Sequence, residues 1–208
     1  MLLLAHTGIT LGIFNLCCKV FSRIASFKEK KVKEKVSPAK LPDSTTRCPD
    51  PPEKIQKLEV DFRLVILGSM FPDMVDKPVG MFIFANFIAN GRIYTHTLLF
   101  NLILVTIGIY FLIKRKRLNF LIFGLSSCFH LLLDEMWLTP RTLFWPLYGW
   151  DFPREDISHW WENIFQALWS NPRVYVPEII GIIILLGIGI KLIKKGMVRE
   201  FLSQGKIP

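Results

Sequence analysis

Residues 97–134, TLLFNLILVTIGIYFLIKRKRLNFLIFGLSSCFHLLLD, decide the structural class of this protein. They form two almost wholly apolar runs, Thr97–Ile113 and Leu118–Leu133, on either side of the basic cluster Lys114–Arg117. Each run approaches the roughly 20 residues of helix that cross a bilayer. We therefore predict two membrane-spanning helices joined by a short basic turn.

Further apolar runs lie on both sides of this pair. Val174–Ile193 and Met1–Phe21 are each long enough to span a bilayer. Phe62–Phe71 and Val79–Ala89 are shorter, so one or both are half-spans or re-entrant segments. The prediction is an all-α fold, a polytopic helical membrane bundle of about five spans. Val79–Ala89 is its candidate re-entrant segment, and residues 1–208 form a single membrane domain.

The overall composition agrees with a membrane protein. Of the 208 residues, 51% are hydrophobic, and the long apolar runs are not interrupted as they would be in a soluble domain. The net charge of +9 would suggest nucleic acid in a soluble protein, but here the cations cluster beside apolar runs. We therefore expect the lipid bilayer as partner and no nucleic acid. The sequence does not predict the oligomeric state.

The basic clusters predict how the spans are oriented. The positive-inside rule puts Lys28–Lys35, Lys114–Arg117 and Lys191–Arg199 in the cytoplasm. The chain is then a multi-pass protein of the cell membrane with a cytoplasmic C-terminus. The charged, Pro-rich residues 27–59 become a cytoplasmic loop insertion, and residues 135–173 become an extracytoplasmic segment that carries all six tryptophans.

Histidine and aspartate side chains gather on the predicted extracytoplasmic side. His130 and Asp134 are four residues apart, so a helix places them on one face where both could reach one cation. A carboxylate in such apolar surroundings is costly and is a functional candidate, although a buried His–Asp hydrogen bond fits equally well. The candidate metal ligands, taken from four separate segments, are His6, Asp73, His96, His130 and Asp134.

This donor set suggests a divalent metal that activates water. Histidine and aspartate together suit zinc first, with manganese or iron as alternatives. The catalytic candidates are Asp76, as a second ligand or a general base, and Arg92, which with Lys77 could hold a phosphate. The competing interpretations are an Asp-rich turn after Pro72, where we expect the chain to turn, and cations that reach lipid headgroups.

Residues 151–163, DFPREDISHWWEN, contain further ionisable side chains. We interpret this stretch as a solvated helix that lies on the membrane interface rather than as part of the metal site. The tryptophans are typical of an interfacial belt, and a lipid-facing wall of an active site would have the same composition. The side chains that could still join the site are Glu155, Asp156, His159 and Glu162.

The order of these motifs resembles the YdjM-like family of membrane-bound metal-dependent hydrolases. The resemblance covers roughly residues 1–150, with residues 27–59 as an insertion, and rests on His6, Gly68–Asp73, Arg92–Thr97, His130–Asp134 and the Trp145–Pro146 pair. Many members have a second aspartate where this chain has Val75, and a histidine where it has Gly91. The resemblance therefore implies at least one metal ion rather than a complete two-metal centre.

A more distant resemblance is to zinc-dependent phospholipase C and the P1-type nucleases, which implies phosphoester hydrolysis. The leading hypothesis is a metal-dependent hydrolase that acts at the outer membrane surface on a phosphoester of a lipid or lipid-linked molecule. The alternatives are a non-enzymatic membrane scaffold with a structural metal or polar site and, less favoured, a transporter. Transport is less favoured because the cluster lies on one side and the chain shows no inverted repeat.

Overall fold

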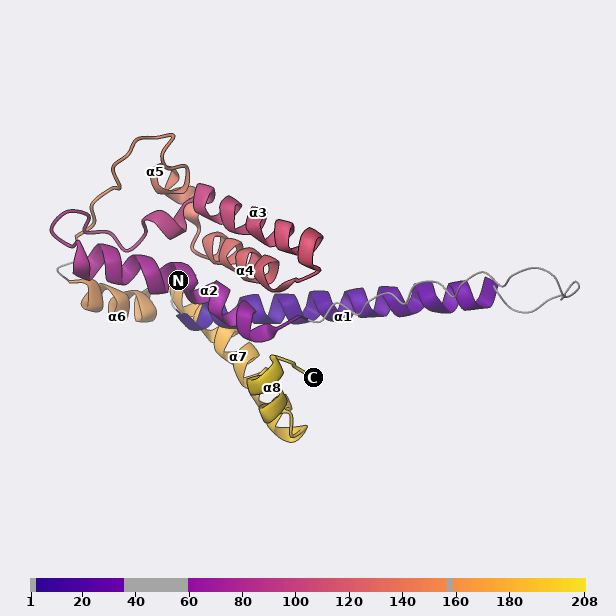
Figure 1. The fold of residues 1–208 in the computed structure, drawn as a ribbon. Coiled ribbons are helices and arrows are strands. Elements are labelled where there is room, and N and C mark those ends of the chain that lie inside the picture. Colours follow the sequence, from indigo (N-terminus) through magenta and orange to yellow (C-terminus); the bar gives the residue numbers. More distant parts are fainter. Residues whose placement is uncertain (1–2, 36–59, 157–158) are drawn as a thin grey trace, which may run out of the picture.

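The computed structural model describes residues 3–35, 60–156 and 159–208, with side chains described outside residues 28–35. The regular structure of these residues is helical throughout (Figure 1), which confirms the prediction of an all-α bundle. The main helices are α1 (Leu3–Lys35), α2 (Phe62–Lys77), α3 (Leu98–Arg115), α4 (Asn119–Leu133), α6 (Trp160–Ser170), α7 (Pro172–Lys194) and α8 (Val198–Gln204). Short turns are η1 (Pro78–Ile83), η2 (Tyr94–His96), η3 (Met136–Leu138) and α5 (Pro140–Leu143).

Three helices are long and apolar enough to cross a membrane: α1 over Leu3–Phe27, α3 and α7. Helix α4 is apolar but shorter, and α2 has only 16 residues. The sequence placed α3, α4 and α7 to within a few residues. It missed α8, which follows α7 after a short turn.

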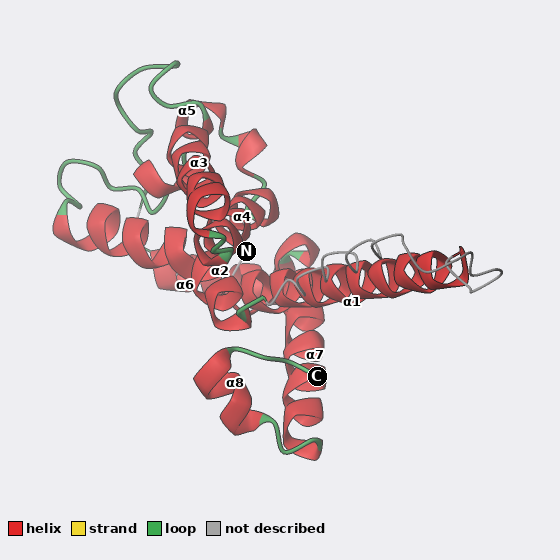
Figure 2. Cartoon of the chain, turned by 45° about the vertical axis from the view of Figure 1, so that its right-hand side comes forward, coloured by secondary structure: helices red, strands yellow, loops and turns green. Residues whose placement is uncertain are grey.

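The helices pack around α2, which contacts both α1 and α4, while α3 lies against α4 and α7 against α1 (Figures 1 and 2). Glycines permit the closest approaches. A Cβ atom on Gly68 of α2 would lie 2.5 Å from the Phe123 carbonyl oxygen of α4, and one on Gly181 of α7 would lie 2.4 Å from the Leu4 carbonyl oxygen of α1. Backbone therefore meets backbone at both crossings, as small residues allow in membrane bundles.

The expectation that the chain turns at Pro72 is wrong, because Pro72 lies inside α2. Proline inside a helix costs about 3 kcal/mol, since it removes one backbone hydrogen bond and crowds the preceding turn. The polar contacts of the last turns of α2 offset this cost. The Thr95 hydroxyl donates to the Pro72 carbonyl (3.1 Å), and Asp73 and Asp76 are buried.

The chain continues past α2 into the π-helical turn η1, so Val79–Ala89 begins as helix. Phe82 and Phe87 in this segment are strongly exposed. Its re-entrant character stays a prediction. The first residues of the predicted 27–59 loop belong to the end of α1, and residues 36–59 lie outside the described part of the chain.

Helix α8 is fastened to the start of α2. The Arg63 guanidinium donates to the carbonyl oxygens of Leu202 (2.8 Å) and Ser203 (3.0 Å), where a cation is favourable at the end of a helix. Phe62 N–H donates to the Gly205 carbonyl (2.9 Å). The hydrogen bonds from Arg63 also hold the pKa of Asp61 below its ordinary value. These contacts fix the end of α2 that is remote from Asp73 and Asp76.

The crossing of α1 and α7 gives a direct test of the packing. We expect Gly181→Ala to destabilise the protein by about 1–3 kcal/mol, because the added methyl group overlaps the α1 backbone. The measurement is the free energy of unfolding in detergent. Gly187→Ala in the same helix is the matched control, since in the described part of the chain no atom outside the neighbouring residues and backbone of α7 lies within 4 Å of its added Cβ. Equal stability of the two variants would contradict the close crossing.

Candidate metal centre

Four buried side chains from three segments of the chain meet at one end of the bundle. Asp73 lies on α2, His96 ends η2, His130 lies in the last turn of α4 and Asp134 directly follows α4. One ligand atom from each lies within 4.8 Å of all the others. This four-residue group, hereafter the His–Asp group, could hold a divalent metal ion.

The two imidazole rings are oriented by partners on their outer sides. His130 Nδ1 lies 2.7 Å from the Ser69 carbonyl oxygen, and His96 Nδ1 lies 2.7 Å from Asp76 Oδ2. Both partners accept hydrogen bonds, so each Nδ1 carries the proton and each Nε2 turns its lone pair inward. The two Nε2 atoms are 3.2 Å apart. Two lone pairs at this distance repel unless a cation, a proton or a metal ion, lies with them.

Asp73 brings a carboxylate oxygen, a third possible metal ligand, to the same point. Its Oδ1 is 3.6 Å from His96 Nε2 and 3.8 Å from His130 Nε2. Both distances are too long for hydrogen bonds, and this buried oxygen has no hydrogen-bond donor among the described residues. Its other oxygen accepts a hydrogen bond from Lys77 Nζ (2.6 Å). A buried acceptor without a donor is costly, and a bound cation would satisfy it.

Asp134 connects the His–Asp group to two of the other predicted site residues. Its Oδ1 is 3.1 Å from His6 Nε2, and its Oδ2 accepts a hydrogen bond from Arg92 Nε (2.9 Å). His6 also stacks on His130, with ring centroids 4.1 Å apart. The structure thus places His6 beside the group, in contact with Asp134, rather than among its four members.

Asp76 lies behind His96, away from the other three members. Its carboxylate accepts the backbone N–H groups of Ile93 (2.8 Å), Thr95 (3.1 Å) and His96 (3.2 Å), besides pairing with the His96 ring. These contacts fix the η2 turn and orient the imidazole. The geometry therefore favours a positioning role for Asp76 over its predicted role as second ligand or base.

The carboxylates beside His96 favour positive charge on its ring. Burial lowers the pKa of His96, but the carboxylates of Asp73 and Asp76 raise it by more, so it lies above its ordinary value. For Arg92 burial likewise lowers the pKa, and the carboxylates of Asp134, Glu155 and Asp73 together raise it by more. The two carboxylates nearest His96 thus make its surroundings a place for a cation.

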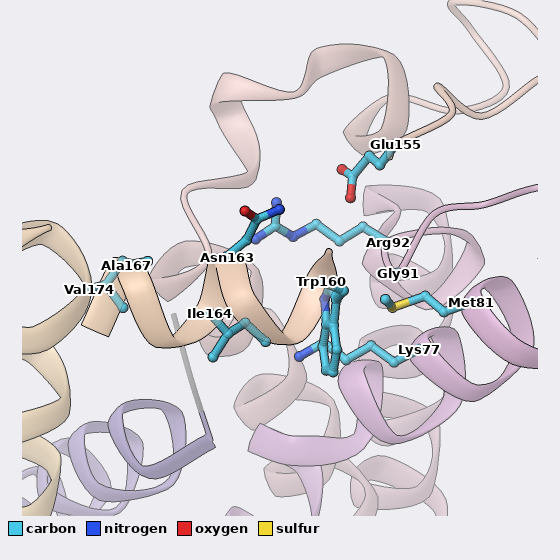
Figure 3. Close-up of a pocket in the computed structure, with 10 residues that line it drawn as sticks. All are labelled: Lys77, Met81, Gly91, Arg92, Glu155, Trp160, Asn163, Ile164, Ala167 and Val174. Carbon is cyan, nitrogen blue, oxygen red and sulfur yellow. The ribbon is translucent and has the colours of Figure 1, made fainter. Parts of the chain in front are cut away.

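Two cavities adjoin the His–Asp group, and Arg92 lines both. The first, of about 240 Å³, lies between the end of α2 and helix α6 and includes Lys77 and Glu155 (Figure 3). The second, of about 270 Å³, reaches Asp134 itself and includes Arg173 at the start of α7. Both cavities bring cationic side chains close to the metal-ligand candidates.

Among the other ionisable residues, Glu155 lines the first cavity. His159 and Glu162 pair with each other (2.9 Å) on the exposed side of the chain, apart from the His–Asp group. Sequence reasoning missed Glu178, which is buried in α7 and accepts the backbone N–H of Ala5 (3.2 Å), next to His6. A lone carboxylate within an apolar span was the signal that could have found it.

The role of Asp76 can be tested by metal affinity. We expect Asp76→Asn to weaken divalent-metal binding by about 10–100-fold, because the ring of His96 loses its anionic partner. Titration with zinc, with Asp151→Asn at an exposed position as control, measures this effect. Unchanged affinity together with lost turnover would instead support a general base.

Comparison with known proteins addresses the family of the chain. No curated protein and no solved structure matches it. The distant resemblance to phospholipase C and P1-type nucleases therefore gains no support. The sequence model of the YdjM inner membrane protein family matches residues 44–198, a range that includes all of the His–Asp group and begins after His6. Since the match covers most of the chain, this protein belongs to the YdjM inner membrane protein family.

Proposed function

We propose that this protein is a membrane-bound metal-dependent hydrolase that acts on a phosphoester of a lipid or lipid-linked molecule. The observation that carries the proposal is the inward orientation of His96 Nε2 and His130 Nε2, 3.2 Å apart. Beside them lies an Asp73 oxygen that has no donor among the residues that the structure describes. Acceptors that converge on one buried point need a cation between them, and a divalent metal ion would satisfy all three at once.

The ligand atoms of the His–Asp group favour a metal ion of intermediate softness. Two imidazole nitrogens and two carboxylate oxygens suit zinc, with manganese or iron as alternatives. When bound, such an ion acts as a Lewis acid and lowers the pKa of a coordinated water. Asp76 and the Ser69 carbonyl hold the two rings at the site, and His6 and Arg92 hold Asp134.

The cations beside the His–Asp group would bind the phosphate. Arg92 uses only Nε for Asp134 in the described contacts, and its side chain is 35% exposed in the cavities. A guanidinium presents a planar pair of donors to phosphate, whereas Lys77 acts as a point charge. We assign Arg92 to steady the phosphoryl group during hydrolysis.

The orientation in the membrane follows from the distribution of charge. Lys114 and Arg115 end α3, and Lys191 and Lys194 end α7. The His–Asp group lies at the opposite end of α3, next to its first turn. With the basic ends in the cytoplasm, the site faces the extracytoplasmic side.

A structural metal or polar site in a non-enzymatic scaffold is the second candidate. The observation that favours it is burial: His96 and His130 are both 0% exposed, and each carboxylate already pairs with a cationic side chain. A closed metal site of this kind would stabilise the fold without turning over substrate.

Metal content tests the common basis of both functions. We expect the purified wild type to carry a stoichiometric divalent ion, measured by elemental analysis, and His130→Ala with Asp134→Ala to lose it. His159→Ala is the matched control, because His159 is exposed and pairs with Glu162 outside the group. A metal-free wild type, or full metal content in a well-folded double variant, would overturn metal binding.

Turnover separates the hydrolase from the scaffold. We expect metal-dependent release of phosphate from phosphomonoester lipids or a nitrophenyl phosphate, abolished by a chelator. Arg92→Lys keeps the charge but loses the planar contact, so kcat/KM should fall by about tenfold. Phosphate release is measured in detergent at matched metal content. A fully metallated protein without turnover on either substrate would favour the scaffold.

A further inference from the structure

Helix α6 has two different faces. Trp160, Ile164 and Ala167 line the cavity of about 240 Å³ on one side, together with Asn163 (Figure 3). The other side carries an aromatic stripe, formed by Trp161, Phe165 and Trp169. These three are four residues apart in turn and therefore share one helix face. Their relative exposures are 64%, 59% and 86%, so the described part of the chain leaves the aromatic stripe uncovered.

The position of α6 indicates what covers the aromatic stripe. Only Asn171 separates its last residue, Ser170, from α7, which is long and apolar enough to cross a membrane. Helix α6 therefore lies where a span enters the bilayer. Tryptophan and phenylalanine on one face, with Glu162 and Gln166 beside them, are typical of a helix that lies in the membrane interface. These features favour lipid as the occupant of this face.

The described residues that line the cavity under α6 include two cations, Lys77 and Arg92, and one carboxylate. Figure 3 shows the side chains of Lys77 and Arg92 extending from the α2 side toward α6, with Trp160 and Asn163 across from them. Glu155 is the single acidic residue among those that line it. The same two cations contact Asp73 and Asp134 of the His–Asp group. An anion bound here would lie between the helix at the interface and the metal ligands.

The size of the cavity limits the ligand. Pockets that enclose a drug-sized molecule measure about 300–1,000 Å³, so this cavity accommodates a headgroup but no acyl chains. Because the outer face of α6 lies in lipid, the chains of such a ligand would stay in the bilayer while its headgroup enters beneath the helix.

We propose that α6 lies in the membrane interface and covers a headgroup site, and that this site takes the phosphate of an anionic lipid directly from the bilayer. Lys77 and Arg92 bind the phosphate, Trp160 packs beside it, and the aromatic stripe anchors α6 in the same leaflet. Identifying this lipid as the substrate rests on the proposed hydrolase function. Binding of the lipid does not, because the described residues that line the cavity include no member of the His–Asp group.

The test is lipid binding by the full-length, chelator-treated protein, which removes the metal from the measurement. We expect phosphatidic acid to bind from phosphatidylcholine nanodiscs and inorganic phosphate to compete only weakly. Phe165→Glu should weaken phosphatidic acid binding by about tenfold, since burying one aromatic side chain contributes at least that factor. Gln166→Glu is the matched control, because it adds the same charge to the polar face one residue later.

The possible outcomes separate this proposal from the hydrolase. Loss of lipid binding in Phe165→Glu and in Trp169→Glu, but not in Gln166→Glu, supports α6 as the interfacial helix that covers the headgroup site. Inorganic phosphate that binds as tightly as the lipid, with no effect of Phe165→Glu, would make the cavity a site for free phosphate and overturn the proposal. So would the absence of phosphatidic acid binding. Neither result bears on metal content or turnover, which are measured separately. A protein that carries no metal as purified and still binds the lipid would refute the hydrolase and leave this proposal standing.

Discussion

The Asp76 carboxylate holds together the end of the bundle on which the candidate site depends. It lies on α2, yet its acceptors are filled by the backbone of Ile93, Thr95 and His96 and by the His96 ring. A buried carboxylate is tolerated only when such donors surround it. Removing it would leave the η2 turn without its anchor and His96 without a fixed tautomer, and both effects reach the His–Asp group.

Sequence patterns predicted the helices better than their ends. Apolar length was sufficient for α3, α4 and α7 because a bilayer selects for it. The prediction of a turn at Pro72 was wrong because the tendency of proline to end a helix is weaker than the buried polar contacts that continue α2 to Lys77. Helix α8 was not predicted. The contacts that fix it join residues far apart in the chain, Arg63 with Leu202 and Ser203.

The candidate site was predictable where spacing constrains geometry. His130 and Asp134 share a helix end, and the structure places both in the His–Asp group. The separate roles of Asp73 and Asp76 were not predictable. They are three residues apart on one helix, and only the fold shows that the first faces two imidazoles while the second faces backbone donors. Glu178, a carboxylate within an apolar span, was missed, and its contact with the Ala5 N–H joins residues far apart in the chain.

The shortness of α2 and α4 links the site to the membrane. A helix of 15 residues, such as α4, rises about 22 Å, less than the roughly 30 Å of a hydrocarbon core. If its basic end, near Arg117, stays at one surface, His130 lies below the other. Polar groups at that depth must be satisfied by protein or by water in a cavity. The partners of the His–Asp group and the cavities beside Arg92 meet this requirement, so a polar centre within the leaflet is compatible with both short helices.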